Sequence, residues 1–174
     1  MIAVVGGKKS GKTTTIEILT KELVRRGYRI AVVKHIPEPN FTFDKEGKDT
    51  WRFAQAGAKT VIGASAEEIA TIEKVHAQDV SLEAILRRCG GNDIAFLEGF
   101  RHIVARDRDV IKIAVLKSAE DFSEAVKIFR PILAFTGPHS PEKQNHEIPY
   151  VDLFGNPEKL VDLVEMAVKK RAAT

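Results

Sequence analysis

"VVGGKKSGKTTT", residues 4–15, places three glycines and three lysines between a short apolar run and a periodic one. Glycine costs conformational entropy on folding and neighbouring lysines repel one another, so a purely structural segment has little reason for this composition. The stretch contains the P-loop pattern Gly6-x-x-x-x-Gly11-Lys12-Thr13, directly after a predicted strand and directly before a predicted helix. We therefore predict that it binds the phosphates of a nucleotide.

Each part of this loop has an expected task. The glycines let the backbone curl so that N–H groups point at phosphate oxygens, and the helix N-terminus adds the positive end of its dipole. Lys12 is expected to reach the β and γ phosphates, and the Thr13 hydroxyl to hold Mg²⁺. The residues predicted to contact the nucleotide are Gly6, Gly7, Lys8, Lys9, Ser10, Gly11, Lys12, Thr13 and Thr14.

Short apolar runs alternate with helical patterns along the chain. Strands are expected at 2–5, 29–33, 93–97, 110–116 and 131–135, and helices at 12–26, 49–56, 81–89, 118–129 and from 157 onward. This alternation indicates βαβ units around a mostly parallel sheet, and the continuous apolar runs indicate strands covered on both faces. The expected fold is α/β, a three-layer P-loop NTPase sandwich. Residues 59–75 are predicted to form an antiparallel β-hairpin inserted into it.

Local signals predict how the helices begin and which side they bury. Asp49, Ser81 and Asn156 are expected to stand at helix N-termini, with Asp49 and Asn156 as N-caps. The first helix is expected to bury Ile16, Leu19, Leu23 and Val24. The proline-rich segments 36–47 and 136–149 are predicted loops.

Length and composition limit the class of protein. A chain of 174 residues with 44% hydrophobic residues suits a single domain over residues 1–174. No apolar run approaches the roughly 18 residues of a membrane span, and the net charge of +3 is spread out, so we expect neither membrane nor nucleic-acid binding. The first residues lack signal-peptide features, and the single Cys89 suits a reducing compartment; a cytoplasmic location is expected.

A P-loop needs a carboxylate for its metal ion. Glu98 follows the apolar run 94–97 and should emerge at the carboxyl edge of the sheet, although a plain solvent-facing charge is the alternative. Asp44 lies in the loop after the second strand, where segments commonly sense the γ phosphate, although such charged loops are usually only solvated. Thr13, Glu98 and Asp44 form the predicted metal site, and Lys12, Glu98 and Asp44 the predicted catalytic set. Lys34 and His35 lie at the same sheet edge without an assigned role.

Three segments together resemble a known family. "GGKKSGKTT", "VVKHIPEPNFTFDKEGKDTWRFAQAGA" and "FLEGFRH" are similar to the MobB family of molybdopterin-guanine dinucleotide biosynthesis adaptor proteins, from Ile2 to about His102. The resemblance implies a homodimeric GTP-binding protein with weak Mg²⁺-dependent GTPase activity. Its implied partner is the guanylyltransferase that attaches GMP to molybdopterin, and the molybdenum cofactor itself is a further candidate ligand.

The family's phosphate and metal roles fall on Gly11, Lys12, Thr13 and Glu98, with Asp44 as an extension. Guanine preference rests on the resemblance alone, because "TGPHSPEK" (136–143) stands where an Asn-Lys-x-Asp guanine reader often follows a strand.

Two other functions fit the same P-loop. A small-molecule kinase would transfer the γ phosphate to a metabolite, and Arg101, Arg106 and Arg108 are candidate phosphate clamps for it. A scaffold whose bound nucleotide only stabilises the fold is the third interpretation.

Overall fold

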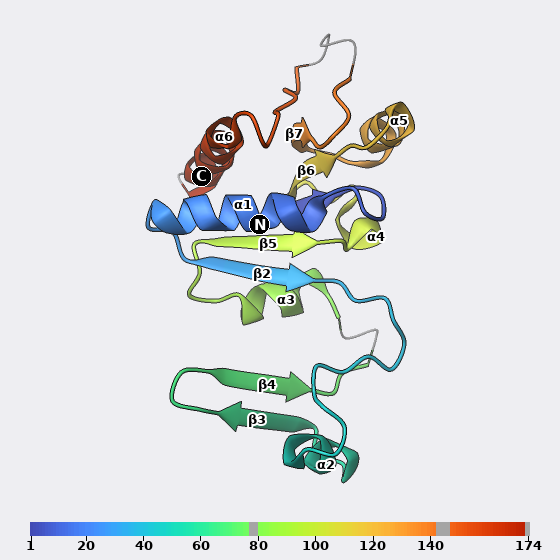
Figure 1. Ribbon diagram of the computed structural model, residues 1–174, viewed down its shortest axis with the longest axis vertical. Helices are drawn as coiled ribbons and strands as arrows, with labels where there is room; N and C mark the ends of the chain where they lie inside the picture. Colours follow the sequence, from blue (N-terminus) through green and yellow to red (C-terminus); the bar gives the residue numbers. More distant parts are fainter. Residues whose placement is uncertain (77–79, 142–146, 173–174) are drawn as a thin grey trace. The chain divides into compact units, whose positions relative to one another are not determined.

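The computed structural model describes residues 1–76, 80–141 and 147–172 (Figure 1). The chain divides into two compact units: Met1–His35 with Leu86–Thr174, called the sheet unit below, and Ile36–Ile85, called the hairpin unit. A single nucleotide-binding domain over the whole chain stays a prediction. Within the described residues, no helix is both long enough and apolar enough to cross a bilayer.

The sheet unit is built on five parallel strands in the order β2-β5-β1-β6-β7 (Figure 1). They are β1 (Ile2–Val5), β2 (Ile30–Lys34), β5 (Ile94–Glu98), β6 (Ile111–Val115) and β7 (Ile132–Thr136). β1 and β6 are buried along their whole length, as the continuous apolar runs predicted. Because β1 is central, the loop that follows it meets the ends of both neighbours, β5 and β6.

Helices cover both faces of this sheet. On one face, α1 (Lys12–Arg25) and α6 (Pro157–Ala172) pack on alternate strand residues in one hydrophobic core (Figure 1). On the other face, Phe122 of α5 (Ala119–Ile128) meets Phe135 of β7, with ring centroids 5.1 Å apart. The α/β sandwich with a mostly parallel sheet is therefore confirmed.

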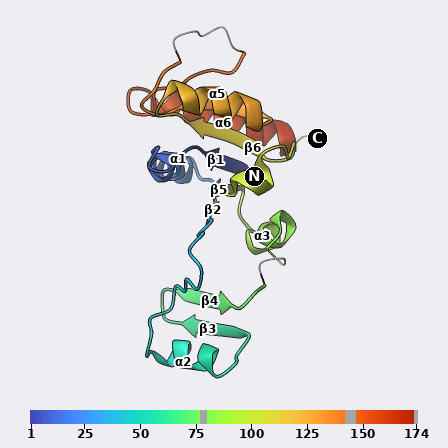
Figure 2. The same cartoon turned by 90° about the vertical axis from the view of Figure 1, so that its right-hand side faces the viewer.

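The hairpin unit contains an antiparallel pair, β3 (Thr60–Ala64) and β4 (Ile69–Glu73), and the helix α2 (Asp49–Gln55) beside β3 (Figure 2). The turn is closed by Ser65, whose N–H donates to the Glu68 carbonyl at 2.8 Å and whose Oγ accepts the Glu68 N–H at 3.0 Å. The predicted inserted hairpin is confirmed. The division between the two units falls within α3 (Leu82–Arg88).

Most predicted helix starts are confirmed. Ser81 accepts from the N–H of Ala84, Ser118 caps α5 by accepting from Asp121, and Asn156 caps α6 by accepting from Lys159. Each side-chain oxygen thus satisfies one N–H of a first helical turn.

Two predictions about helices were wrong and one element was missed. Val24 is 54% exposed, because the buried stripe of α1 runs through Ile16, Leu19 and Leu23. Asp49 is the first residue of α2 and not its cap; the cap position is Lys48, and Asp49 complements the helix dipole from the first turn. The missed element is the single-turn helix α4 (Arg101–Val104). Of the predicted loop 136–149, residues 142–146 lie outside the described residues.

Candidate functional site: the phosphate loop

The loop between β1 and α1 has the backbone of an anion cradle. Gly6, Lys9 and Gly11 all have positive φ, at 151°, 58° and 101°. A side chain at Gly6 would place its Cβ 2.4 Å from the carbonyl oxygen of Val115, so β6 leaves room only for glycine there. The left-handed conformation of Lys9 costs free energy, because a lysine has a Cβ and glycine does not. Backbone strain of this kind is often found in ligand-binding loops. The curled backbone and the N-terminus of α1 together favour an anion.

Lys12 folds back over this loop. Its ammonium donates to the carbonyl oxygens of Gly7 at 2.6 Å and Gly6 at 3.2 Å. Burial lowers the pKa of Lys12 below its usual value, while the nearby Glu98 carboxylate opposes this shift. The site therefore holds a partly desolvated cation where the sequence predicted the phosphate-binding lysine.

Thr13 and Glu98 meet at the carboxyl edge of the sheet. The Thr13 hydroxyl lies 3.1 Å from both carboxylate oxygens of Glu98. Two adjacent ligands of an octahedral Mg²⁺, each at 2.0–2.1 Å, lie about 3 Å apart, and hydroxyl and carboxylate oxygens are the donors this ion prefers. These two residues fit the predicted metal ion. The alternative for Glu98, a plain solvent-facing charge, is disfavoured because its side chain is only 13% exposed.

Lys34 is the second partner of Glu98. Its ammonium lies 3.0 Å from Glu98 Oε1, and the two residues are register partners on the adjacent strands β2 and β5. His35 follows it, donating its backbone N–H to the Glu98 carbonyl at 2.9 Å and setting its ring edge-on to Phe100 at 5.3 Å. The sequence placed Lys34 and His35 at this edge, but their contacts depend on the strand order.

Lys117 lies beside the phosphate loop, and its place there was not predicted from the sequence. It follows β6, its ammonium donates to the Lys8 carbonyl at 3.2 Å, and its backbone N–H donates to Asp121 at 3.0 Å. A Cβ on Gly7 would lie 3.3 Å from Lys117 Cε. Its position directly after a buried strand was the available signal, because strand ends on one edge of a parallel sheet gather there.

Asp44 belongs to the hairpin unit. Its Oδ1 accepts from the N–H of Lys45 and from the hydroxyl of Thr50, both at 2.9 Å. It also lines a cavity of about 260 Å³ together with Trp51 and Lys74. These contacts hold its own loop together, and a metal role for Asp44 stays a prediction.

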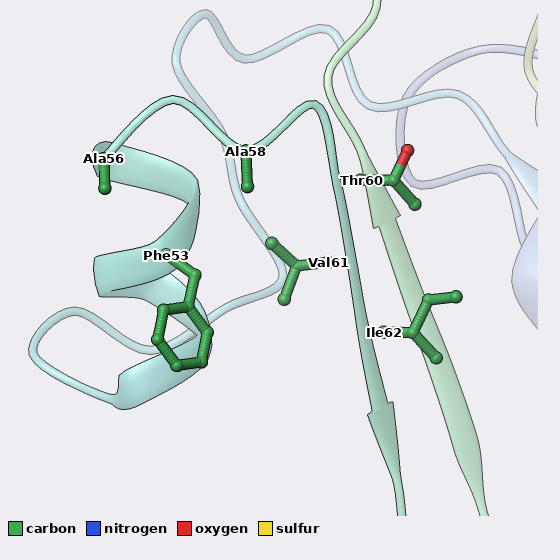
Figure 3. Close-up of a pocket in the computed structure, with 6 residues that line it drawn as sticks. All are labelled: Phe53, Ala56, Ala58, Thr60, Val61 and Ile62. Atoms are coloured by element: carbon green, nitrogen blue, oxygen red, sulfur yellow. The ribbon is translucent and has the colours of Figure 1, made fainter.

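A second hollow of the hairpin unit, about 520 Å³, is unsuited to phosphate. It is lined by Phe53, Ala56, Ala58, Thr60, Val61 and Ile62 (Figure 3). Figure 3 shows Phe53 of α2 and Val61 of β3 pointing toward one another across it. Its lining residues carry no charge and one hydroxyl, so the hollow offers no cation to a phosphate group.

Arg101, a candidate phosphate clamp for a kinase, is engaged elsewhere. Its guanidinium pairs with the carboxylate of Glu124 and lies 5.7 Å above the ring centroid of Phe129. Binding a phosphate would therefore require breaking an ion pair.

A protein-family model matches more than half of the chain. The model of molybdopterin guanine dinucleotide synthesis protein B, MobB, matches residues 1–135. The chain belongs to the MobB family. The match extends past His102, where the sequence resemblance was expected to fade, and includes β6.

Curated MobB relatives are similar over part of their length. A molybdopterin-guanine dinucleotide biosynthesis adapter protein of Haemophilus influenzae is 37% identical over 103 residues, 58% of this chain and 57% of that protein. A putative adapter of the same description from Methanocaldococcus jannaschii is 36% identical over 69% of this chain and 48% of its own length. The Escherichia coli adapter is 28% identical over 77% of this chain and 75% of its own length. The chain thus spans about half the length of the first two relatives.

Solved MobB structures share the fold. A crystal structure of molybdopterin-guanine biosynthesis protein B superposes with a TM-score of 0.72 at 24% identity, covering 97% of this chain and 98% of that one. The Bacillus subtilis MobB structure gives a TM-score of 0.70 at 25% identity, covering 95% of both chains.

Proposed function

We propose that this protein is a GTP-binding adaptor with weak Mg²⁺-dependent GTPase activity, which assists the guanylation of molybdopterin or the delivery of the resulting molybdenum cofactor. The observation that supports the proposal most directly is the contact beside the phosphate loop, where the Thr13 hydroxyl lies 3.1 Å from both carboxylate oxygens of Glu98. It occurs in a chain of the MobB family. Its place of action is the cytoplasm, and it acts as a homodimer.

The loop accounts for the phosphates and the metal ion. Lys12 supplies an ammonium beside the loop, and the N-terminus of α1 supplies its dipole and N–H donors to phosphate oxygens. Thr13 and Glu98 would hold Mg²⁺, which supplies charge neutralisation between the phosphates when bound. Guanine as the base follows from the guanine dinucleotide named in the relatives' descriptions.

An adaptor role agrees with the surroundings of the loop better than a kinase role does. A kinase needs a free base to accept the proton of the attacking hydroxyl. In the proposed complex Glu98 is assigned to Mg²⁺ together with Thr13, and Arg101 is paired with Glu124. The partner we propose is the molybdopterin guanylyltransferase, with the molybdopterin cofactor as a further ligand.

Calorimetric titration with GTP, GDP and ATP, each with Mg²⁺ and with EDTA, tests the nucleotide part. We expect GTP to bind more tightly than ATP, and binding to depend on Mg²⁺. A pull-down with the guanylyltransferase of the same organism, in each nucleotide state, tests the adaptor part. Fast phosphate transfer to a metabolite without any association with that enzyme would favour the kinase instead.

A further inference from the structure

We propose that Lys34 is a tethered competitor of the metal ion: in the metal-free protein its ammonium neutralises Glu98, and Mg²⁺ binds there only by displacing it. Lys34 would then set the metal concentration at which the nucleotide complex becomes complete. The inference rests on the proposed nucleotide and metal binding of the phosphate loop.

The contact that carries the inference is direct. Lys34 Nζ lies 3.0 Å from Glu98 Oε1, while the Thr13 hydroxyl lies 3.1 Å from the same oxygen. A cation therefore already faces the carboxylate beside the hydroxyl expected to coordinate the ion.

The strand pairing builds this contact into the sheet. Lys34 and Glu98 are register partners on the parallel strands β2 and β5, and residues paired in register project from the same face. Both are the last residues of their strands, at the edge where the phosphate loop lies. The strand register therefore brings the two side chains to adjacent positions, so that the ammonium can reach the carboxylate without any ligand.

Glu98 is shielded from solvent and Lys34 is exposed, which is the arrangement expected of a carboxylate with a displaceable cation. The side chain of Glu98 is 13% exposed, whereas that of Lys34 is 55% exposed. A shielded carboxylate costs free energy unless a cation or donor faces it, so Glu98 needs a partner in the absence of metal. The ammonium of Lys34 can return to water at little cost, because ion pairs of exposed lysines are weak.

Two cations on one carboxylate oxygen repel each other. Mg²⁺ approaches its ligands to 2.0–2.1 Å, so an ion on Glu98 Oε1 would lie within a few ångströms of Lys34 Nζ. Metal binding therefore has to break the Lys34–Glu98 pair, and removing Lys34 should strengthen metal binding.

The test is a Mn²⁺ titration of the full chain saturated with a non-hydrolysable GTP analogue, with free Mn²⁺ followed by electron paramagnetic resonance. For Lys34→Met we expect the Mn²⁺ concentration at half saturation to fall about two- to tenfold, and for Lys34→Arg to stay near the wild-type value. Lys21→Met is the control: it removes the same charge from an exposed position on α1, outside the phosphate loop and its neighbours. Its half-saturation value should remain unchanged.

A double-mutant cycle locates the effect on Glu98. In a Glu98→Gln background, Lys34→Met should no longer change the half-saturation value. Unchanged or weaker Mn²⁺ binding in Lys34→Met, with native circular dichroism, would overturn the inference, as would an equal gain in the Glu98→Gln background. If Lys34→Met does not fold, Lys34→Gln decides in the same way. Failure of the wild type to bind the analogue counts against the proposed function instead.

Discussion

At the scale of single residues, Lys12 shows how the phosphate loop is prepared for its ligand. Its ammonium is partly desolvated, which lowers its pKa, and its donors face the neutral carbonyl oxygens of Gly6 and Gly7. A phosphate oxygen carries a negative charge, so replacing a carbonyl by a phosphate converts a neutral acceptor into a charge-assisted one. The proposed nucleotide complex would therefore offset more of the cost of burying the ammonium than the two carbonyl oxygens do.

Lys12→Ala should weaken Mg²⁺–GTP binding by about ten- to hundredfold, because a charge-assisted hydrogen bond is worth about 1.5–3 kcal/mol and 1.4 kcal/mol corresponds to tenfold in affinity. Calorimetric titration measures the change. Lys21→Ala, on the exposed side of the same helix α1, is the control and should bind like the wild type. Equal affinity of Lys12→Ala and the wild type would contradict the assignment of the phosphate loop.

Lys112 is a second lysine whose buried environment disfavours the charged form of the side chain. It lies in the middle of β6 with its side chain fully buried, and its ammonium donates to the carbonyl oxygens of Asp107 and Arg130. Burial lowers the pKa of Lys112 from 10.5 to about 8. Below pH 8 both the folded and the unfolded chain carry the charge, and the folded state bears the full cost of burying it.

Between about pH 8 and 10.5, the folded protein releases a proton that the unfolded chain keeps. The contribution of Lys112 to the free energy of unfolding should therefore rise with pH over this range, by at most about 3 kcal/mol. Urea unfolding of the wild type and Lys112→Met at pH 7.5, 9 and 10 measures it. The difference in unfolding free energy should shift in favour of the wild type as pH increases, and a constant difference would show that the ammonium stays charged.

At the scale of secondary-structure elements, the site follows from the central place of β1. Its loop meets Glu98 at the end of β5 and Val115 at the end of β6, since both strands pair with β1. The close approach of Gly6 to the Val115 carbonyl makes the β1–β6 contact part of the phosphate loop. A substitution there acts on two elements at once.

Gly6→Ala should destabilise the protein by about 1–3 kcal/mol and weaken GTP binding, because its Cβ would lie 2.4 Å from a backbone carbonyl and its φ of 151° suits glycine. Thermal unfolding and calorimetric titration check both effects. Gly63→Ala in β3 is the matched control, since a Cβ there meets no atom within 4 Å. A Gly6→Ala protein as stable as the wild type would mean that β1 and β6 separate easily.

The elements also show why some features were predictable from sequence and others were not. The strand-loop-helix pattern at 2–25 is local, so the P-loop, β1 and α1 could be predicted from neighbouring residues alone. The Lys34–Glu98 and Lys117–Lys8 contacts join segments far apart in sequence and depend on the strand order β2-β5-β1-β6-β7. Periodicity along the chain carries no information about which strands pair, so these contacts required the structure.

Single-turn elements and helix flanks were the other source of error. α4 has only four residues, too few to show a helical periodicity. Its N-cap is Phe100 at φ 54°, which is not one of the usual capping residues, so the sequence gives no sign of a helix start there. Val24 neighbours Leu23 on α1, but one residue turns a helix by about 100°, enough to carry Val24 out of the core.

At the scale of the whole molecule, the predicted phosphate-loop residues and the inserted hairpin lie in different compact units of the chain. The sheet unit contains Lys12, Thr13, Glu98 and Lys34, while Asp44 and the two hollows lie in the hairpin unit. This division suits the proposed adaptor role, in which bound triphosphate would hold one conformation and slow hydrolysis would release it.

The intrinsic GTPase activity should accordingly be slow. In the proposed Mg²⁺–GTP complex Glu98 is assigned to the metal ion together with Thr13, so this carboxylate is not free to orient an attacking water. We expect turnover nearer the roughly 10⁻⁴ s⁻¹ of an unassisted small GTPase than the 1–100 s⁻¹ of kinases. Phosphate release under saturating Mg²⁺–GTP, alone and with the molybdopterin guanylyltransferase, measures it. Thr13→Ala should lower the rate further, because the Thr13 hydroxyl is assigned to the metal ion. Turnover above 1 s⁻¹ by the isolated protein would instead mark it as a dedicated enzyme and remove the main argument for an adaptor.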